Sequence, residues 1–158
     1  MPTSESEKEL ITKKLVDKAV PTWLSYIRLY NLCISVLDSQ LVTIGYTVAQ
    51  YEALTHLYRD PGISQKQLAA RCFVAKSGMS MLLKKMEEDR WIARTAHSTD
   101  ARSKLLELTP LGQKQVKQML IVQAKVVGAM AMPLSTKEMD QFAQIIKRIS
   151  ASLELIKN

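Results

Sequence analysis

The chain of 158 residues lacks most of the short motifs that identify enzymes and metal proteins. It holds only two cysteines, which form no Cys-x-x-Cys pair, and two histidines that are far apart, so a zinc site is not expected. It has no Gly-rich phosphate loop, no Gly-x-Ser-x-Gly turn and no His pair at metal-ligand spacing. We therefore expect neither enzymatic activity nor a metal or cofactor.

Long apolar runs are also missing. No run approaches the roughly 18 apolar residues of a membrane-spanning helix. The first residues are polar and acidic, without the apolar core of a secretory signal. Repeats, low-complexity tracts and long linkers are absent as well. The sequence predicts one domain over residues 1–158, in the cytoplasm and without membrane contact.

The charge that is present has one predominant sign. The net charge is +7. Residues 64–104 contain nine Lys or Arg and four acids, and so contribute +5 of that total. A basic chain favours a polyanionic partner, because each neutralised phosphate releases counterions. Basicity alone is weak evidence, since many basic surfaces bind nothing specific.

Residues 64–104 also carry the clearest structural pattern, which is helix, helix, strand, polar loop, strand. Residues 64–71 are typical of a short helix, with Ser64 placed to cap its first backbone N–H groups. The next helix has one apolar stripe, formed by Met79, Leu82, Leu83 and Met86. Its opposite face carries Ser77, Ser80, Met81, Lys84 and Lys85. Such a helix suits a DNA major groove.

Two short runs rich in apolar residues, 91–95 and 104–108, predict strands, and the polar loop 96–103 between them predicts a hairpin, or wing. The fold class is therefore mainly α with a small β-hairpin wing. We place the winged helix-turn-helix at residues 47–108 and long helices at 8–41 and 111–156. Pro21 either begins or kinks the first of these helices. Capping signals mark three helix starts, at Thr47 with Gln50, at Thr109-Pro110, and at Ser135 with Glu138.

The flanking helices are too apolar for one small winged domain to cover. Their C-terminal apolar residues are Met119, Leu120, Val122, Val126, Val127, Met130, Met132, Phe142, Ile145, Ile146, Ile149, Leu153 and Ile156. A homodimer is the simplest explanation. It would place two recognition helices in successive major grooves about 34–36 Å apart, which predicts a pseudo-palindromic site in double-stranded DNA. The alternative is that these faces close on the chain's own core.

The motif residues resemble the MarR family of bacterial transcription regulators. They are Leu68-Ala69, Val74, Ser77-Gly78-Met79-Ser80, Leu82-Leu83, Met86-Glu87, Trp91-Ile92-Ala93-Arg94, Asp100-Ala101-Arg102 and Leu108-Thr109-Pro110-Leu111-Gly112. The likeness spans nearly the whole chain, and Asp-x-Arg followed by Leu-Thr-x-x-Gly is its most specific part. It implies a homodimer that binds an operator through a recognition helix and a wing. It also implies release of DNA by a small aromatic ligand or an oxidant, and favours a repressor over an activator.

Four positions depart from the family's pattern. Ala75 stands where a Ser or Thr usually caps the recognition helix, and Gly78 replaces a common Thr inside it. Close approach to DNA and crowding against a neighbouring helix are two explanations for Gly78. Arg90 stands at the usual helix-ending Gly, where a non-Gly residue is disfavoured in the left-handed conformation. Ala101 removes a basic side chain from the wing, which predicts weaker minor-groove contact.

The candidate DNA-binding residues are Ser64, Lys66, Lys76, Ser77, Gly78, Ser80, Met81, Lys84, Lys85, His97, Ser98, Thr99, Asp100, Arg102 and Lys104. Ser77, Ser80 and Met81 are best placed for base edges. Lys84 and Lys85 are suited to phosphates. For any single one, a solvated helix surface is the alternative. Arg102 resembles the family's DNA-facing or wing-ordering Arg, with Asp100 as its partner, although that pair has a purely structural alternative.

An effector site and a redox site are further hypotheses. In the family, small ligands often occupy a cleft between the dimer helices and the winged domain, and aromatic walls for it are available from Trp23, Tyr26, Tyr30, Tyr51 and His56. An ordinary core role is the alternative for these side chains. Cys33 and Cys72 allow an oxidant-sensing regulator, but buried structural thiols are the favoured interpretation. A winged helix used only for protein contacts is the remaining rival.

Overall fold

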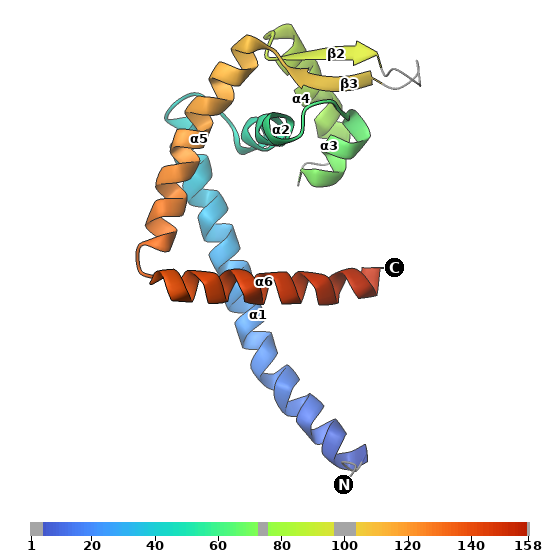
Figure 1. Cartoon of the computed structure of the whole chain (residues 1–158), viewed down its shortest axis with the longest axis vertical. Helices are drawn as coiled ribbons and strands as arrows, with labels where there is room; N and C mark the ends of the chain where they lie inside the picture. Colours follow the sequence, from blue (N-terminus) through green and yellow to red (C-terminus); the bar gives the residue numbers. More distant parts are fainter. Residues whose placement is uncertain (1–4, 73–75, 97–103, 158) are drawn as a thin grey trace.

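The computed structural model describes residues 5–72, 76–96 and 104–157, and at residues 5–11, 76–77, 96 and 157 it describes the backbone alone. The elements follow one another as α1 (Glu5–Val42), α2 (Val48–Arg59), β1 (Ile63–Ser64), α3 (Gln65–Arg71), α4 (Lys76–Glu88), β2 (Ile92–Ala96), β3 (Lys104–Leu108), α5 (Pro110–Ala131) and α6 (Thr136–Lys157). Figure 1 shows α2 to β3 gathered at one end of the molecule, with α1 and α5 leading away from them.

The predicted mainly helical fold with a winged helix-turn-helix is confirmed. The sheet is antiparallel with the strand order β1-β3-β2. Strand β3 pairs with β2 from Ile92 opposite Leu108 to Ala96 opposite Lys104. Strand β1 was not predicted. It has only two residues, and Ser64 serves at the same time as the N-cap of α3, so no period-2 pattern marks it.

The helices begin where their capping residues predict. The Thr47 hydroxyl accepts from the backbone N–H of Gln50 at 3.2 Å, and the Gln50 side chain accepts from the Thr47 N–H at 2.9 Å. Ser64 and Gln67 form a second capping box, at the start of α3. The start of α6 has the same arrangement between Ser135 and Glu138, whose hydrogen bonds lower the pKa of the Glu138 carboxyl. These caps satisfy N–H groups that a helix end leaves without partners.

The core of the winged domain lies between α2, α4, the sheet and the first half of α5. Its fully buried members include Leu54, Leu57, Leu68, Met79, Leu83, Met86, Leu106, Val116 and Met119. Of the predicted α4 stripe, three residues are fully buried and Leu82 is half-buried. The orientation of α4 is therefore fixed by burial, and its opposite face must point outward.

The link from α4 to the wing is a tight reversal. The N–H of Arg90 donates to the carbonyl of Glu87 at 3.0 Å, and the N–H of Trp91 donates to that of Met86 at 2.8 Å. These are the two hydrogen bonds of a Schellman motif, which needs a left-handed residue at its penultimate position. Arg90 supplies it with a φ of 60°. The expectation from the sequence that a non-Gly residue adopts this conformation is confirmed.

The long helices leave the winged domain. α1 continues through Pro21, so of the two alternatives for this residue the structure excludes the one in which Pro21 begins the helix. α6 follows α5 with a bend of 105° between them. Figure 1 shows α6 and the first half of α1 lying away from the winged domain. In the described part of the chain no single helix is long and apolar enough to cross a membrane, and only α5 and α6 taken together as a bent pair meet that criterion, by length and composition alone.

The apolar faces of the flanking helices do not all close on the chain's own core. Met119 and Val122 of α5 are buried. On α6, by contrast, exposed apolar side chains include Ile145, Ile146, Ile149, Leu153 and Ile156. On α1 they include Leu15, Val16, Val20, Trp23, Leu24 and Leu32. The alternative of a self-contained core thus holds for the first half of α5 and not for α6.

Candidate nucleic-acid interface

The outward face of α4 is a row of exposed side chains. Ser80, Lys84 and Lys85 are exposed, and Met81 is 75% exposed although it is a large apolar residue. Gly78 is exposed on the same helix, so crowding against a neighbouring helix does not account for it. A helix held by a buried stripe, with an exposed Met, Ser and two Lys opposite, has the composition of a groove-reading surface.

Lys84 and Lys85 of α4 are each paired with an acid one turn further along the chain. Lys84 Nζ lies 4.0 Å from Glu88 Oε1, and Lys85 Nζ lies 3.0 Å from Asp89 Oδ1. The hydrogen bond to Asp89 and its charge raise the pKa of Lys85. Exposed ion pairs of this kind contribute little to stability, so the ammonium groups can exchange their carboxylates for phosphates.

Three predicted DNA-binding residues outside α4 have defined places. Ser64 is occupied locally, because its hydroxyl accepts from the Gln67 N–H at 3.3 Å and donates to Gln67 Oε1 at 2.9 Å. Lys66 is exposed on the first turn of α3, and Lys104 is exposed at the start of β3. The structure therefore gives Ser64 a capping role and leaves the two lysines available to solvent.

The tip of the wing lies outside the described residues. This applies to the predicted contacts His97, Ser98, Thr99, Asp100 and Arg102, and also to Ala75 and Ala101. The side chains of Lys76 and Ser77 lie outside the description too, although their backbone begins α4.

A hydrogen-bonded network that the sequence did not predict joins three elements behind the α4 face. Arg94 of β2 donates from Nε to Glu87 Oε2 at 3.0 Å and from Nη1 to Gln65 Oε1 at 3.2 Å. Gln65, the first residue of α3, donates from Nε2 to Ser80 Oγ at 2.8 Å. No sequence spacing pairs these residues, because they come from α3, α4 and β2.

A further ion pair connects the ends of α2 and α3. Arg71, the last residue of α3, lies 2.5 Å from Asp60, which follows the end of α2. The backbone N–H of Asp60 donates to the carbonyl of His56 at 2.9 Å and so closes α2. The two helices that precede α4 are thereby joined at their C-terminal ends.

The predicted effector residues come from α1 and α2. Trp23 and Tyr26 are 59% and 52% exposed, whereas Tyr30, Tyr51 and His56 are half-buried. Burial raises the pKa of Tyr30, and the charges of nearby Glu52 and Tyr26 raise it further. Tyr51 and His56 are five positions apart. Since each residue turns a helix by about 100°, these two lie on different faces of α2.

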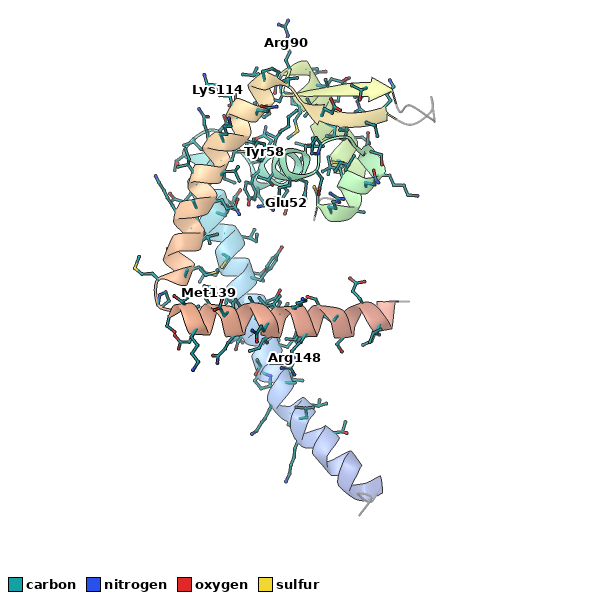
Figure 2. The ribbon with its side chains drawn as sticks, in the orientation of Figure 1. Glu52, Tyr58, Arg90, Lys114, Met139 and Arg148 are labelled. Atoms are coloured by element: carbon teal, nitrogen blue, oxygen red, sulfur yellow. The ribbon has the colours of Figure 1, made fainter. Side chains whose placement is uncertain are left out.

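A pocket of about 350 Å³ lies elsewhere, where α2 ends and α5 begins, lined by Leu57, Tyr58, Pro61, Glu107, Leu108 and Gln113. None of the five predicted effector residues lines it. Tyr58, which belongs to α2, is labelled in Figure 2.

The two cysteines differ in their surroundings. Cys72 is buried, and burial together with the charge of Glu52 raises the pKa of its thiol to about 11. Because the thiolate is the reactive form, Cys72 is held in the unreactive state at neutral pH. Cys33 is half-buried on α1. Among the described residues, no group of His, Cys, Asp and Glu has the arrangement of a metal site.

Comparisons with known proteins agree with this geometry. Residues 44–103 match the model of the MarR family. Over this segment the chain is similar to the MarR family. It is 25% identical over 125 residues to the HTH-type transcriptional repressor YetL of Bacillus subtilis, covering 78% of this chain and 75% of YetL. It is 24% identical to the HTH-type transcriptional repressor Rv2887 of Mycobacterium tuberculosis, covering 72% and 82% of the two chains. The chain is thus similar to proteins named as HTH-type transcriptional repressors.

Solved structures show the same fold. A mutant MarR from E. coli complexed with operator DNA matches with a TM-score of 0.71 and 18% identity, covering 85% of this chain and 97% of that one. Rv2887 in complex with salicylic acid matches with a TM-score of 0.66 and 23% identity, covering 81% and 94%. At these identities the likeness establishes the winged-helix architecture alone.

Proposed function

We propose that this chain is a MarR-family transcription regulator, a sequence-specific repressor that binds a pseudo-palindromic operator as a homodimer. The observation that carries the proposal is the exposed face of α4, where Ser80, Met81, Lys84 and Lys85 lie opposite a stripe whose residues Met79, Leu83 and Met86 are fully buried. The E. coli relative was solved with operator DNA, which supports the same use of this surface. Ser80 and Met81 are assigned to base edges, and Lys66, Lys84, Lys85 and Lys104 to phosphates.

The wing completes the proposed interface. Strands β2 and β3 of the three-stranded sheet pair with each other, and residues 97–103 connect them in the sequence. His97, Ser98, Thr99 and Arg102 are assigned to the minor groove or the backbone, with Asp100 as the partner of Arg102. Lys76, Ser77 and Gly78 are assigned to the start of the recognition helix.

The homodimer is supported by the apolar stripe of α6, defined here as Phe142, Ile145, Ile146, Ile149, Leu153 and Ile156. Ile149, Leu153 and Ile156 are 55%, 60% and 79% exposed in the single chain, and their spacing places them along one side of the helix. Monomers rarely leave so long an apolar strip in water. A second copy of the chain, packing through α1, α5 and α6, would cover it.

Release by a small aromatic ligand is the regulatory part of the proposal. Rv2887 has been solved with salicylic acid and with p-aminosalicylic acid, which supports an aromatic effector for this chain. Trp23, Tyr26 and Tyr30 lie at i, i+3 and i+7 on one side of α1 and supply the proposed wall, with Tyr51 and His56 contributed by α2. A location in the cytoplasm remains a prediction from the sequence.

The test is a selection of bound fragments from genomic DNA of the source organism, at physiological salt, with the purified protein. Enriched palindromes whose half-sites lie one helical turn apart are the expected result. Affinity for the selected site should fall steeply as salt rises, because phosphate contacts release counterions. Fragments no more enriched than bulk DNA would contradict the proposal and favour a winged helix that contacts only proteins.

A further inference from the structure

The network behind α4 consists of Gln65, Ser80, Glu87 and Arg94, and we call it the Gln65–Arg94 network. Its three hydrogen bonds measure 2.8, 3.0 and 3.2 Å. It joins the first residue of α3, two turns of the recognition helix and the wing strand β2. The Arg94 side chain is only 22% exposed. Its guanidinium is therefore enclosed between the elements that it connects and is not displayed as a phosphate contact.

The chemistry of the four side chains fixes the direction of every bond. An Arg guanidinium has donors and no acceptor, so Arg94 must be met by oxygen atoms at Glu87 and Gln65. With its Oε1 accepting from Arg94, the Gln65 amide must present its NH₂ group to Ser80. The hydroxyl oxygen of Ser80 is then the acceptor. The position of the wing strand thus determines which hydrogen-bonding group is offered to a residue of the recognition helix.

We propose that Gln65 and Arg94 are positioning residues that set the sequence preference of DNA binding, by holding the Ser80 hydroxyl and the wing in one fixed arrangement. This inference rests on the proposed function. Neither residue is assigned to a DNA contact. Gln65 acts by donating to the Ser80 hydroxyl. Arg94 acts by orienting Gln65 and by connecting β2 to the C-terminal half of α4 through Glu87.

Gln65→Glu is the sharpest probe. A carboxylate at this position keeps the bond to Arg94 but has no proton to donate to Ser80, so the Ser80 hydroxyl must turn and donate inward. The added negative charge also repels DNA, which requires a control. Gln67→Glu adds the same charge two positions along α3, and Glu accepts the capping-box hydrogen bond from Ser64 as Gln67 does.

The experiment selects preferred sites from a randomised operator library for the parent, Gln65→Glu, Gln67→Glu, Ser80→Ala and the Gln65→Glu/Ser80→Ala double variant. We expect both charge variants to bind all sequences more weakly by a similar factor. Only Gln65→Glu should also change discrimination at the base pairs that Ser80→Ala affects, by about threefold to tenfold, the range typical of one hydrogen bond. The double variant should show the preference of Ser80→Ala alone.

The outcomes distinguish a failure of this inference from a failure of the proposed function. Gln67→Glu should keep the sequence preference of the parent. If the parent selects a site and Gln65→Glu also keeps that preference, the inference is overturned and the proposed function stands. If the parent selects no site, both fall. Arg94→Lys provides a second variant, because Lys keeps the charge but cannot reach Glu87 and Gln65 together in a fork. A folded Arg94→Lys protein with unchanged preference would likewise overturn the inference.

Discussion

The carbonyl oxygen of Trp91 lies directly against Gly112, in the space that a β-carbon would occupy. The contact is made by backbone on both sides, because α5 begins where the chain reverses after α4. Thr109, the N-cap of α5, donates from its N–H to the same carbonyl at 3.0 Å and from its hydroxyl to the carbonyl of Arg90 at 2.6 Å. The start of α5 is thereby attached to the base of the wing.

Gly112→Ala is therefore expected to destabilise the fold by about 3 kcal/mol, the upper part of the range for overpacking, since a backbone carbonyl cannot move aside like a side chain. Gly128→Ala is the matched control. It lies in the same helix with no atom within 4 Å of the added carbon, and it should stabilise the helix by roughly 0.5–1 kcal/mol. Urea unfolding of both variants at one protein concentration measures the difference. Equal effects of the two substitutions would contradict this account of the junction.

Arg90 gives a prediction of the opposite sign. Its φ of 60° is unfavourable for any residue with a β-carbon, and Gly is free of that penalty, so Arg90→Gly should stabilise the protein by about 1 kcal/mol. Figure 2 shows the Arg90 side chain projecting outward from the junction of α4 and β2. Arg90→Ala removes the same side chain but keeps the strained φ, and it should bring no such gain in thermal unfolding. A gain for Ala equal to that for Gly would assign the effect to the side chain.

Much of this fold follows from local signals in the sequence. The caps at Thr47, Ser64, Thr109 and Ser135 place four helix starts, and each depends on residues at most three positions apart. The stripe of α4 identifies its buried side, because a helical period alone decides which residues share a face. The same helical period predicts which residues of α4 face outward, and these include Ser80, Met81, Lys84 and Lys85.

What the sequence did not reveal depends on contacts between elements. The Gln65–Arg94 network needs three elements in their final positions, and Gln65 and Arg94 are 29 positions apart. Strand β1 exists only because β3 lies beside it, with Ile63 opposite Leu106. The sequence predicted that Ser64 caps α3. It did not predict that the Ser64 hydroxyl is therefore engaged with Gln67 and less available to DNA.

The apolar stripe of α6 predicts how assembly responds to charge. Ile149→Glu places a carboxylate in the middle of the stripe, where Ile149 is 55% exposed in the single chain. We expect it to shift the protein from dimer to monomer, because burying an unpaired charge is highly unfavourable. Ala151→Glu adds the same charge on a different side of α6, two positions along, and should leave the dimer intact. Sedimentation equilibrium distinguishes the two, and a dimeric Ile149→Glu protein would remove α6 from the proposed interface.

The thiol of Cys72 predicts a loss of stability at alkaline pH. Its pKa is raised from 9.0 to about 11 in the folded chain, mainly by burial. Between these two values the unfolded state releases the thiol proton and the folded state keeps it, so the free energy of unfolding falls as the pH rises. The loss from this group is at most about 1.4 kcal/mol per pH unit. Well below pH 9.0, where the thiol is protonated in both states, the group should contribute no pH dependence.

The measurement compares urea unfolding of the parent and of Cys72→Ala at several pH values from 7 to 11. Other groups that titrate in this range, including Tyr46 and Tyr51 with their raised pKa values, are common to both proteins and cancel in the difference. At neutral pH the parent should be the more stable, because Ala leaves a small cavity. That advantage should shrink above pH 9.0, where the unfolded thiol ionises. An advantage that stays constant to pH 11 would mean that Cys72 ionises as readily in the folded chain, and the oxidant-sensing alternative through Cys72 would regain support.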